Sequence, residues 1–268
     1  MKTVALNLSI LFTVCCHSAF PQSTGVQFEH LSVEDGLSQL SVISIFQDKQ
    51  GFMWFGTRNG LNRYDGYGFE TFQEFDTGKP VSNGQIECIA EDGQNRLWAG
   101  TRRGLNRYDA VAGCFIPYFH AAGDSTLSHD NITSLFRDRA GNLWVGSMHG
   151  LNRYLPETDN FKRYPFNGLL SDAAIYALAE DTAGNLWIGT GRGLFIYNPL
   201  SEKMLHPQET VQERISCLLS DSRGRMWIGF HQNGISMYDA SGGGFIRFGR
   251  SEGLNHVNVR SIEEDRDG

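Results

Sequence analysis

The amino-acid sequence predicts an all-β fold, a β-propeller built from four-stranded antiparallel blades. One unit of sequence recurs along the chain with a spacing of 40 to 46 residues, which is the length of a propeller blade. Each unit consists of short runs of β-branched and aromatic residues separated by turn residues, a pattern typical of strands rather than helices. A single blade cannot bury its own two faces, so the recurrence predicts blades packed face to face around an axis.

An aspartate and a tryptophan anchor each unit. The tryptophan follows the aspartate by six residues in five units, and these are all the tryptophans of the chain. The aspartate begins a tight turn whose backbone amides its carboxylate is suited to bind. Apolar residues flank each tryptophan, so the second strand is expected to be buried on both faces with the tryptophan in the core. The structural pairs are Asp48 and Trp54, Asp92 and Trp98, Asp138 and Trp144, Asp181 and Trp187, and Asp221 and Trp227.

The other strands of the unit are predicted from the residues around this anchor. A β-branched residue lies six positions before each aspartate, and a small residue, such as Ser44 or Cys88, lies four positions before it. A recurring small residue indicates a crowded position, as where several strands converge on an axis. The third strand reads "GLNRYD" in the first two units, and its Asn-Arg pair is expected to be structural. The fourth strand carries paired aromatic residues, such as Phe69 and Phe72.

The two ends of the predicted array align with each other. Residues 28–48 align without a gap with residues 245–265, so an outer strand without a blade of its own is predicted at 27–31. The first strand of a further blade is predicted at 259–264, and we therefore expect the chain to be truncated from a longer protein. The five complete blades are expected near residues 42–75, 86–119, 132–165, 175–205 and 215–248.

The first residues differ from the rest of the chain. Residues 1–20 hold one lysine, then a mostly apolar stretch and small residues, which is typical of a secretory signal peptide. The propeller is expected to occupy residues 21–268. Val14 precedes Cys15, and this disfavours lipid attachment there, which usually requires a small residue before the cysteine. The three cysteines beyond the signal peptide are expected to be buried thiols.

The composition disfavours several classes of partner. The formal net charge is −7, whereas nucleic-acid binding requires a basic surface. Every glycine of a turn belongs to the repeat, so no phosphate-binding loop is predicted. The histidines lie at different repeat positions without ligand spacing. The sequence therefore predicts no cofactor, no metal centre, no catalytic residue and no contact of this segment with nucleic acid.

The unit "D-x-x-G-x-[LM]-W-h-G-T-x-x-G-L-x-R-Y", where h is apolar, resembles the two-component regulator propeller repeat. The resemblance extends from Phe28 to Gly268. Such repeats form the periplasmic sensor region of bacterial hybrid two-component systems of the Bacteroidota. The resemblance implies a seven-bladed propeller, of which this chain would hold five blades and the start of a sixth. It also implies inner-membrane and histidine kinase segments elsewhere in the same protein, so no enzymatic activity is expected of this chain.

Two sets of loops are candidates for ligand binding. The loops between second and third strands are basic, and guanidinium groups bind carboxylates and sulfates bidentately. The loops that lead into the first strands carry polar groups suited to sugar hydroxyls. An oligosaccharide derived from a glycan is the expected ligand, and control of polysaccharide-utilisation genes the expected role. The candidate residues are Arg58, Arg102, Arg103, His149, Arg192 and His231 in the first set, and Asn83, His129, Tyr176 and His256 in the second.

Other interpretations remain open. An arginine in a repeated loop can instead pair with a carboxylate of the neighbouring blade, which would make it structural. A secreted propeller enzyme, a lyase or a glycosidase, would share similar strands. The turn, however, runs Asp-x-x-Gly in most units where the sialidase motif runs Asp-x-Gly, and no nucleophile and base can be singled out. A non-signalling propeller that docks proteins, and a homodimer of the sensor, are also compatible with the sequence.

Overall fold

The structure is a computed structural model that describes residues 28–78, 80–165, 168–170, 172–208, 213–239 and 244–265. The predicted signal peptide at 1–20 lies outside the described residues. The chain divides into two compact units, Met1–His30 and Leu31–Gly268, and the fold described below is that of the second. Among the described residues, no helix has the length and apolar character needed to cross a membrane.

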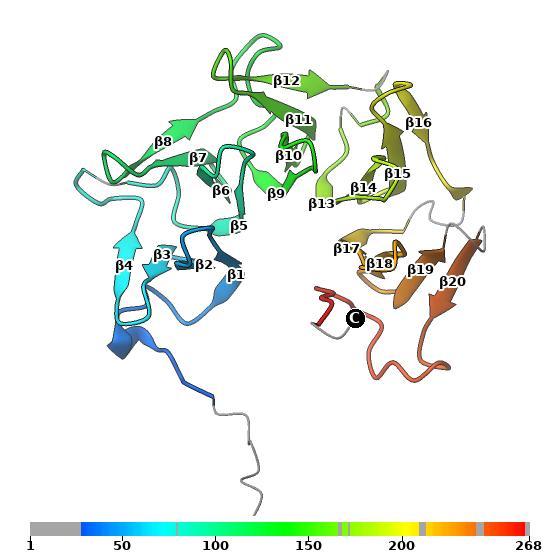
Figure 1. Cartoon of the computed structure of the whole chain (residues 1–268), viewed down its shortest axis with the longest axis horizontal. Helices are drawn as coiled ribbons and strands as arrows, with labels where there is room; N and C mark the ends of the chain where they lie inside the picture. The colour runs from blue at the N-terminus through cyan, green and yellow to red at the C-terminus, as the bar shows by residue number, and fades with distance from the viewer. Residues whose placement is uncertain are drawn as a thin grey trace, which may run out of the picture. The chain divides into compact units, whose positions relative to one another are not determined.

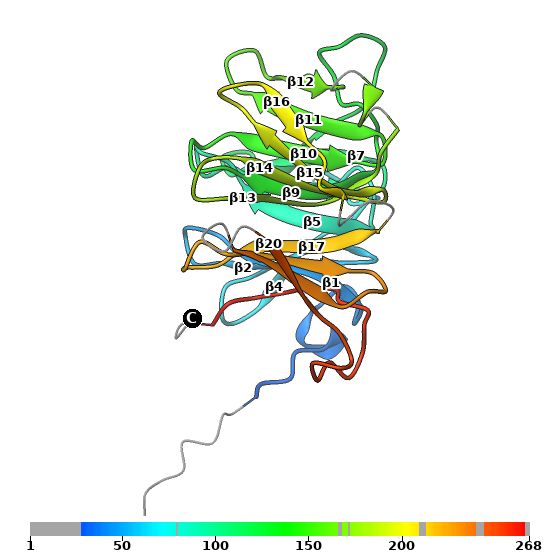
Figure 2. The same ribbon diagram turned by 90° about the vertical axis from the view of Figure 1, so that its right-hand side faces the viewer.

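The second unit is all-β, with one 3₁₀ turn, η1 (Val33–Asp35), before the first strand. Its described strands form five antiparallel sheets of four strands each, and this confirms the predicted fold class. Figure 1 shows that the sheets follow one another around a common centre, and Figure 2 shows the same array from the side. The first blade contains β1 (Val42–Gln47), β2 (Met53–Thr57), β3 (Gly60–Tyr64) and β4 (Phe69–Phe72).

The other four blades repeat this order of strands. The second blade contains β5 (Ile86–Glu91), β6 (Leu97–Thr101), β7 (Gly104–Asp109) and β8 (Cys114–Tyr118). The third contains β9 (Ile132–Arg137), β10 (Leu143–Ser147), β11 (Gly150–Leu155) and β12 (Asn160–Tyr164). The fourth contains β13 (Ile175–Glu180), β14 (Leu186–Thr190), β15 (Gly193–Asn198) and β16 (Lys203–Leu205). The fifth contains β17 (Ile215–Ser220), β18 (Met226–Phe230), β19 (Ile235–Asp239) and β20 (Gly244–Phe248).

The repeat aspartate joins the first two strands of each blade. In the first blade, one carboxylate oxygen of Asp48 accepts hydrogen bonds from the backbone N–H groups of Gln50 and Phe52 at 3.0 and 2.9 Å. The other oxygen accepts a hydrogen bond from Nε1 of Trp54 at 2.7 Å. The same tryptophan-to-aspartate bond recurs in the other four blades at 2.8–2.9 Å. Turn and core are therefore linked through one side chain in every blade.

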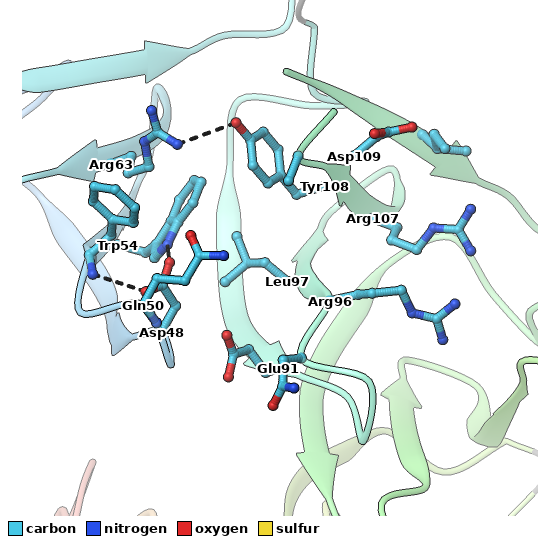
Figure 3. Close-up of a pocket in the computed structure, with 14 residues that line it drawn as sticks. Asp48, Gln50, Trp54, Arg63, Glu91, Arg96, Leu97, Arg107, Tyr108 and Asp109 are labelled. Carbon is cyan, nitrogen blue, oxygen red and sulfur yellow. Dashed lines mark hydrogen bonds between the residues drawn. The ribbon is translucent and has the colours of Figure 1, made fainter. Parts of the chain in front are cut away.

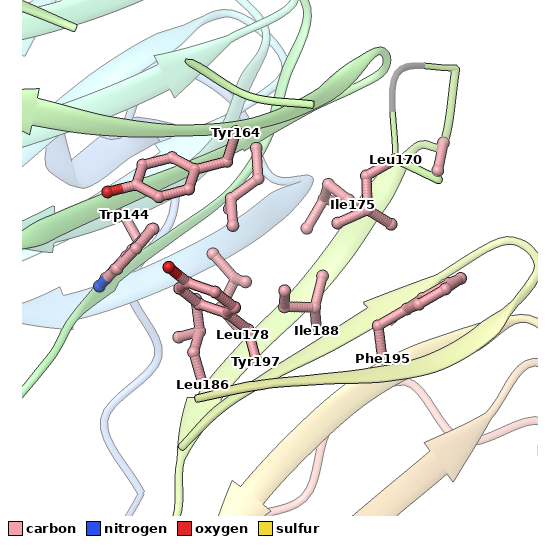
Figure 4. Packing of buried hydrophobic residues seen from close by; sticks show 11 residues of the cluster. Trp144, Tyr164, Leu170, Ile175, Leu178, Leu186, Ile188, Phe195 and Tyr197 are labelled. Atoms are coloured by element: carbon pink, nitrogen blue, oxygen red, sulfur yellow. The ribbon is translucent and has the colours of Figure 1, made fainter. Parts of the chain in front are cut away.

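The hydrophobic core lies between blades. Trp144 of β10 belongs to a cluster with Ile188 of β14 and Tyr197 of β15, so the third blade packs on the fourth through its tryptophan (Figure 4). Trp144 is 2% exposed, and Ile188 is completely buried. Similar clusters join the first blade to the second, the second to the third and the fourth to the fifth. Because each blade buries a face of its neighbour, the array is stabilised mainly by these junctions.

Two predicted strands are not strands in the structure. Residues 259–264 form no strand, and they have no hydrogen-bonded strand beside them among the described residues. They nevertheless pack on the fifth blade, since Ser216 Oγ donates to the Val259 carbonyl and the Ser222 N–H donates to Glu264 at 2.8 Å. Residues 28–31 of the predicted outer strand also form no strand, and residue 27 lies outside the described residues. A β-strand requires a partner strand, and neither segment has one there.

One cluster of hydrogen bonds between the second and third blades depends on ionisation. Asp159 accepts hydrogen bonds from the hydroxyls of Tyr118 and Tyr154 at 2.7 and 2.6 Å, and Arg107 Nη1 lies 2.7 Å from the same oxygen. Burial alone would raise the pKa of Asp159, but the bonds from Tyr154, Tyr118 and Arg107 outweigh burial and lower it. Asp221 behaves alike: burial would raise its pKa, but Trp227 and Arg225 lower it.

We therefore expect the free energy of unfolding to decline in acid. A carboxylate whose pKa is lowered by folding contributes its full stabilisation above its unfolded pKa of about 3.9 and loses it as the pH falls through the folded value. Urea midpoints measured from pH 6 to pH 2.5 should fall below about pH 4. Asp159→Asn should reduce this acid dependence because asparagine does not titrate. Equal acid dependence in both proteins would show that the pKa of Asp159 is not lowered.

Candidate functional site

The two sets of candidate loops lie beside one another on one face of the propeller. The N–H of Gly60, in the turn between β2 and β3, donates to the Gly84 carbonyl just before β5 at 2.7 Å. The N–H of Gly104 donates in the same way to the Asp130 carbonyl before β9 at 2.7 Å. The N–H of Gly150 donates likewise to the Ala173 carbonyl at 3.0 Å, so in the first three blades the loop between the second and third strands is held against the segment that leads into the next blade. Polar side chains from two neighbouring blades can therefore reach one ligand.

A cavity of about 620 Å³ lies on this face at the inner ends of the first and second blades. Two of the candidate residues, Arg58 and Arg102, line it together. Arg102 Nε donates to Glu87 at 2.7 Å, and this ion pair holds one guanidinium group at the wall. Arg58 is exposed, and its guanidinium has no ion pair among the described residues. The other residues of the lining are Leu40, Ser41, Val42, Ile43, Gln85, Glu87 and Arg260.

Arg103 and Asn83 do not reach this cavity. Both side chains lie beside the carboxylate of Glu74, which follows the last strand of the first blade. Asn83 Nδ2 donates to Glu74 at 3.0 Å, and Arg103 Nη1 lies 3.9 Å from the same carboxylate. The pairing joins two blades, which is the structural role considered above for an arginine of the repeated loops. We therefore do not place these two residues in the candidate site.

The histidines His129 and His149 form a separate pair. Their rings are stacked, with centroids 4.7 Å apart and an interplanar angle of 11°. Burial lowers the pKa of His129, and the neighbouring His149 lowers it further. His149 Nδ1 lies 3.9 Å from Asp172, and His149 lines a different cavity with Lys162 and Arg163. These two candidates are thus brought together, but at a different position from the arginines.

The remaining candidates lie apart from one another. The guanidinium carbon of Arg214 lies 4.0 Å from the ring centroid of Tyr176, so a cation covers one face of this aromatic ring. Arg192 and His256 are exposed, and His231 is partly exposed. None of these three side chains makes a hydrogen bond or an ion pair within the described part of the chain. The candidate residues therefore form three pairs and four single positions rather than one continuous ring.

Sequence reasoning missed Glu87, Arg260 and Arg214. Glu87 and Arg260 lie five positions before a repeat aspartate, as does the candidate Tyr176, so comparison of this position across the units would have found them. Arg214 lies seven positions before Asp221, which is the position of Gln85 in the second unit. Both positions belong to the first strand or to the residues that lead into it, and Figure 1 shows that the first strands β1, β5, β9, β13 and β17 lie nearest the centre of the array.

The described residues offer no metal site, since no group of three histidine, cysteine or carboxylate side chains there could hold an ion. Cys88, Cys114 and Cys217 carry free thiols. Burial raises the pKa of Cys217 to about 11, which makes this thiol a weak nucleophile at neutral pH. Burial raises the pKa of Cys88 as well.

Comparison with known proteins finds the same fivefold repeat that the five sheets of the structure show. The model of the two-component regulator propeller matches the chain five times, at residues 36–59, 80–103, 126–149, 168–192 and 211–232. Histidine kinase P4 of Formosa agariphila is 41% identical over 73 residues, which are 27% of this chain and 5% of that protein.

Solved structures include two extracellular domains from B. thetaiotaomicron. That of a putative one-component system is 27% identical with a TM-score of 0.67, and the match covers 78% of this chain and 31% of that one. The extracellular domain of a putative hybrid two-component system is 26% identical with a TM-score of 0.57, and the match covers 88% of this chain and 39% of that one.

The structure of a virginiamycin B lyase from Staphylococcus aureus with quinupristin matches with a TM-score of 0.64 at 13% identity. The match covers 82% of this chain and 73% of the lyase chain. At this low identity the likeness shows only that the two proteins share a fold. The chain spans well under half the length of the kinase and of the two extracellular domains. The repeated match, one match for each blade, shows that this chain carries five two-component regulator propeller repeats.

Proposed function

We propose that this chain is the ligand-sensing part of a hybrid two-component system. It would act in the periplasm, and segments outside this chain would anchor the parent protein in the inner membrane and carry its histidine kinase. The match to a histidine kinase and the likeness to extracellular domains of such systems support this role. The propeller itself would bind the signal molecule, and a rearrangement of its blades would be passed on to the other segments of the same protein.

The ligand that the geometry favours is an oligosaccharide derived from a glycan. The observation that carries this proposal is the cavity on the loop face, where Arg58 and Arg102 lie together with Gln85 and Glu87. The guanidinium groups can bind a carboxylate or sulfate of a sugar through paired hydrogen bonds. The amide of Gln85 and the carboxylate of Glu87 can bind hydroxyl groups. The system would control the genes for the use of the polysaccharide from which this oligosaccharide derives.

Binding to a panel of oligosaccharides tests this function. Calorimetry of the protein against neutral, uronic-acid and sulfated oligosaccharides should find at least one that binds. Arg102→Gln should weaken that binding roughly tenfold or more, since a hydrogen bond to a charged group contributes about 1.5–3 kcal/mol. Arg103→Gln is the matched control, because the neighbouring arginine pairs with Glu74 outside the cavity. No binding by any oligosaccharide, or equal loss in both variants, would contradict the proposed site.

A further inference from the structure

A second cavity, of about 440 Å³, lies between the first and second blades at the opposite ends of the strands (Figure 3). It adjoins the turn between β1 and β2, whereas Arg58 follows the far end of β2. Phe52, Trp54, Leu97 and Tyr108 provide aromatic and aliphatic walls. The function proposed above makes no use of this cavity.

The charged groups around the cavity leave an excess of carboxylates. The three arginines of its lining, Arg63, Arg96 and Arg107, are each paired at 2.7 Å with a carboxylate that does not line the cavity. The three carboxylates that do line it have no ion pair among the described residues. These carboxylates are Asp48, Glu91 and Asp109. An occupant of this cavity is therefore expected to be positively charged.

Asp48 differs from the repeat aspartates of the other four blades. In those blades the residue four positions after the aspartate donates a side-chain hydrogen bond to the oxygen that also accepts from the tryptophan. The donors are Arg96 at 2.7 Å, Asn142 at 2.8 Å, Asn185 at 2.8 Å and Arg225 at 2.6 Å. The first blade has Phe52 at this position, whose side chain has no donor, so among the described residues this oxygen of Asp48 accepts only from Trp54. A carboxylate oxygen can accept two hydrogen bonds, and one acceptor site is left over.

The junction between the second and third blades shows what can fill such a site. There the Arg96 side chain lines the corresponding cavity, which is smaller at about 290 Å³. Its guanidinium group donates to Asp92 and lies 5.1 Å from the ring centroid of Tyr154. Tyr108 is the counterpart of Tyr154 in the first junction. A guanidinium group thus lies between a repeat aspartate and the tyrosine of the next blade at this junction, where the first junction has the ring of Phe52 and the third and fourth blades have Asn142 and Asn185.

Arg63 does not replace the missing group. Its Nη1 lies 3.4 Å from the Tyr108 hydroxyl, and Arg107 makes the corresponding contact to Tyr154 at 2.8 Å. Arg63 is therefore the counterpart of Arg107, and it is already paired with Glu70.

Glu91 supplies a second acceptor for the occupant. Glu91 is 9% exposed, and one of its carboxylate oxygens accepts a hydrogen bond from the Lys49 N–H at 3.1 Å. The other oxygen makes no hydrogen bond within the described part of the chain, and the residue lines the cavity (Figure 3). A nearly buried carboxylate with an open oxygen binds a donor-rich cation strongly.

We propose that this cavity binds a guanidinium group, the side-chain group of arginine. The planar group would donate to Asp48 and Glu91 and lie against the ring of Tyr108, as Arg96 lies against Tyr154. The proposal is independent of the ligand on the loop face, because the two cavities share no residue.

The test uses two probes of nearly the same shape that differ in charge. N-acetyl-L-arginine amide should bind at least tenfold more tightly than the citrulline compound, whose neutral urea has a carbonyl oxygen in place of one NH₂ group. Glu91→Gln should weaken binding of the arginine probe at least fivefold. Glu180→Gln is the matched control, since Glu180 accepts a backbone hydrogen bond from Arg139 in the equivalent position of the fourth blade. A short peptide with a central arginine should bind more tightly than the amide if the source is a polypeptide, and less tightly if it is a free small molecule.

A substitution that fills the cavity provides an independent test. Phe52→Arg gives the first blade the arginine that the second blade has, so it should raise the melting temperature by a few degrees and reduce probe binding at least tenfold. Equal binding of the arginine and citrulline compounds would overturn the proposal. So would probe binding that neither Phe52→Arg nor Glu91→Gln weakens. The two substitutions act differently on stability, so one of them remains informative if the other variant does not fold.

Discussion

Replacing Trp98 by alanine should destabilise the protein by about 3–5 kcal/mol, which is a large part of the stability of an ordinary domain. The indole is completely buried between the second and third blades. It lies 4.6 Å from the ring centroid of Tyr154 in the next blade and 5.4 Å from that of Tyr118 in its own. Its loss would leave a void at a junction and remove a hydrogen bond from Asp92, which is 2% exposed.

Chemical denaturation of Trp98→Ala and Trp98→Phe measures these two contributions. Phenylalanine keeps most of the aromatic surface but cannot donate to Asp92, so it should cost about 1–2 kcal/mol. Arg96 still donates to the same carboxylate in this variant. A loss below about 1 kcal/mol for Trp98→Ala would contradict the assignment of the tryptophans as the main contacts between blades.

The fold was predictable because the repeat specifies register as well as strands. The aspartate of the turn binds the tryptophan six residues later, so the spacing that the sequence shows is the spacing that the hydrogen bond requires. The five blades follow from it. The strands predicted at 27–31 and 259–264 rest on the same pattern, but the described residues of these segments, 28–31 and 259–264, form no strand, since a strand also needs a neighbour. Pattern alone does not show whether a neighbour is present.

The candidate site was less predictable, since the direction of a loop side chain depends on residues of another blade. Arg102 and Arg103 are neighbours in sequence, yet the first lines the cavity and the second turns to Glu74. Arg260 reaches the cavity beside Arg58 because the array curves around its centre, and spacing within one unit carries no information about that curvature. The sequence therefore predicted the kind of loop but not which of its side chains share a cavity.

Phe52 illustrates a different limit. The position four residues after the aspartate is arginine or asparagine in the other complete units and phenylalanine only in the first. This difference is visible in the sequence. Its meaning requires the structure, which shows that the arginine or asparagine donates to the aspartate and that the first junction has a larger cavity.

The recurring small residue before each aspartate leads to the second prediction of large effect. In the second blade this residue is Cys88, and it pairs with Gly100 of β6 across the sheet. A Cβ atom on Gly100 would lie 2.6 Å from Cys88 Sγ and 2.7 Å from Cγ2 of Ile132 in the third blade. Gly100→Ala should therefore cost about 3 kcal/mol, because both the sheet and the junction would have to open. Gly68→Ala is the matched control, since a Cβ there meets nothing within 4 Å.

A double-mutant cycle separates the two causes of crowding at Gly100. Cys88→Ala removes the sulfur atom, so Gly100→Ala should cost less in the Cys88→Ala background than in the wild type. The cost should not disappear, because Ile132 of the next blade still lies against the new methyl group. Complete recovery would place the crowding within one sheet, and no recovery would place it wholly at the junction. A Gly100→Ala protein as stable as Gly68→Ala would show that the blades separate there without cost, which contradicts close packing around the axis.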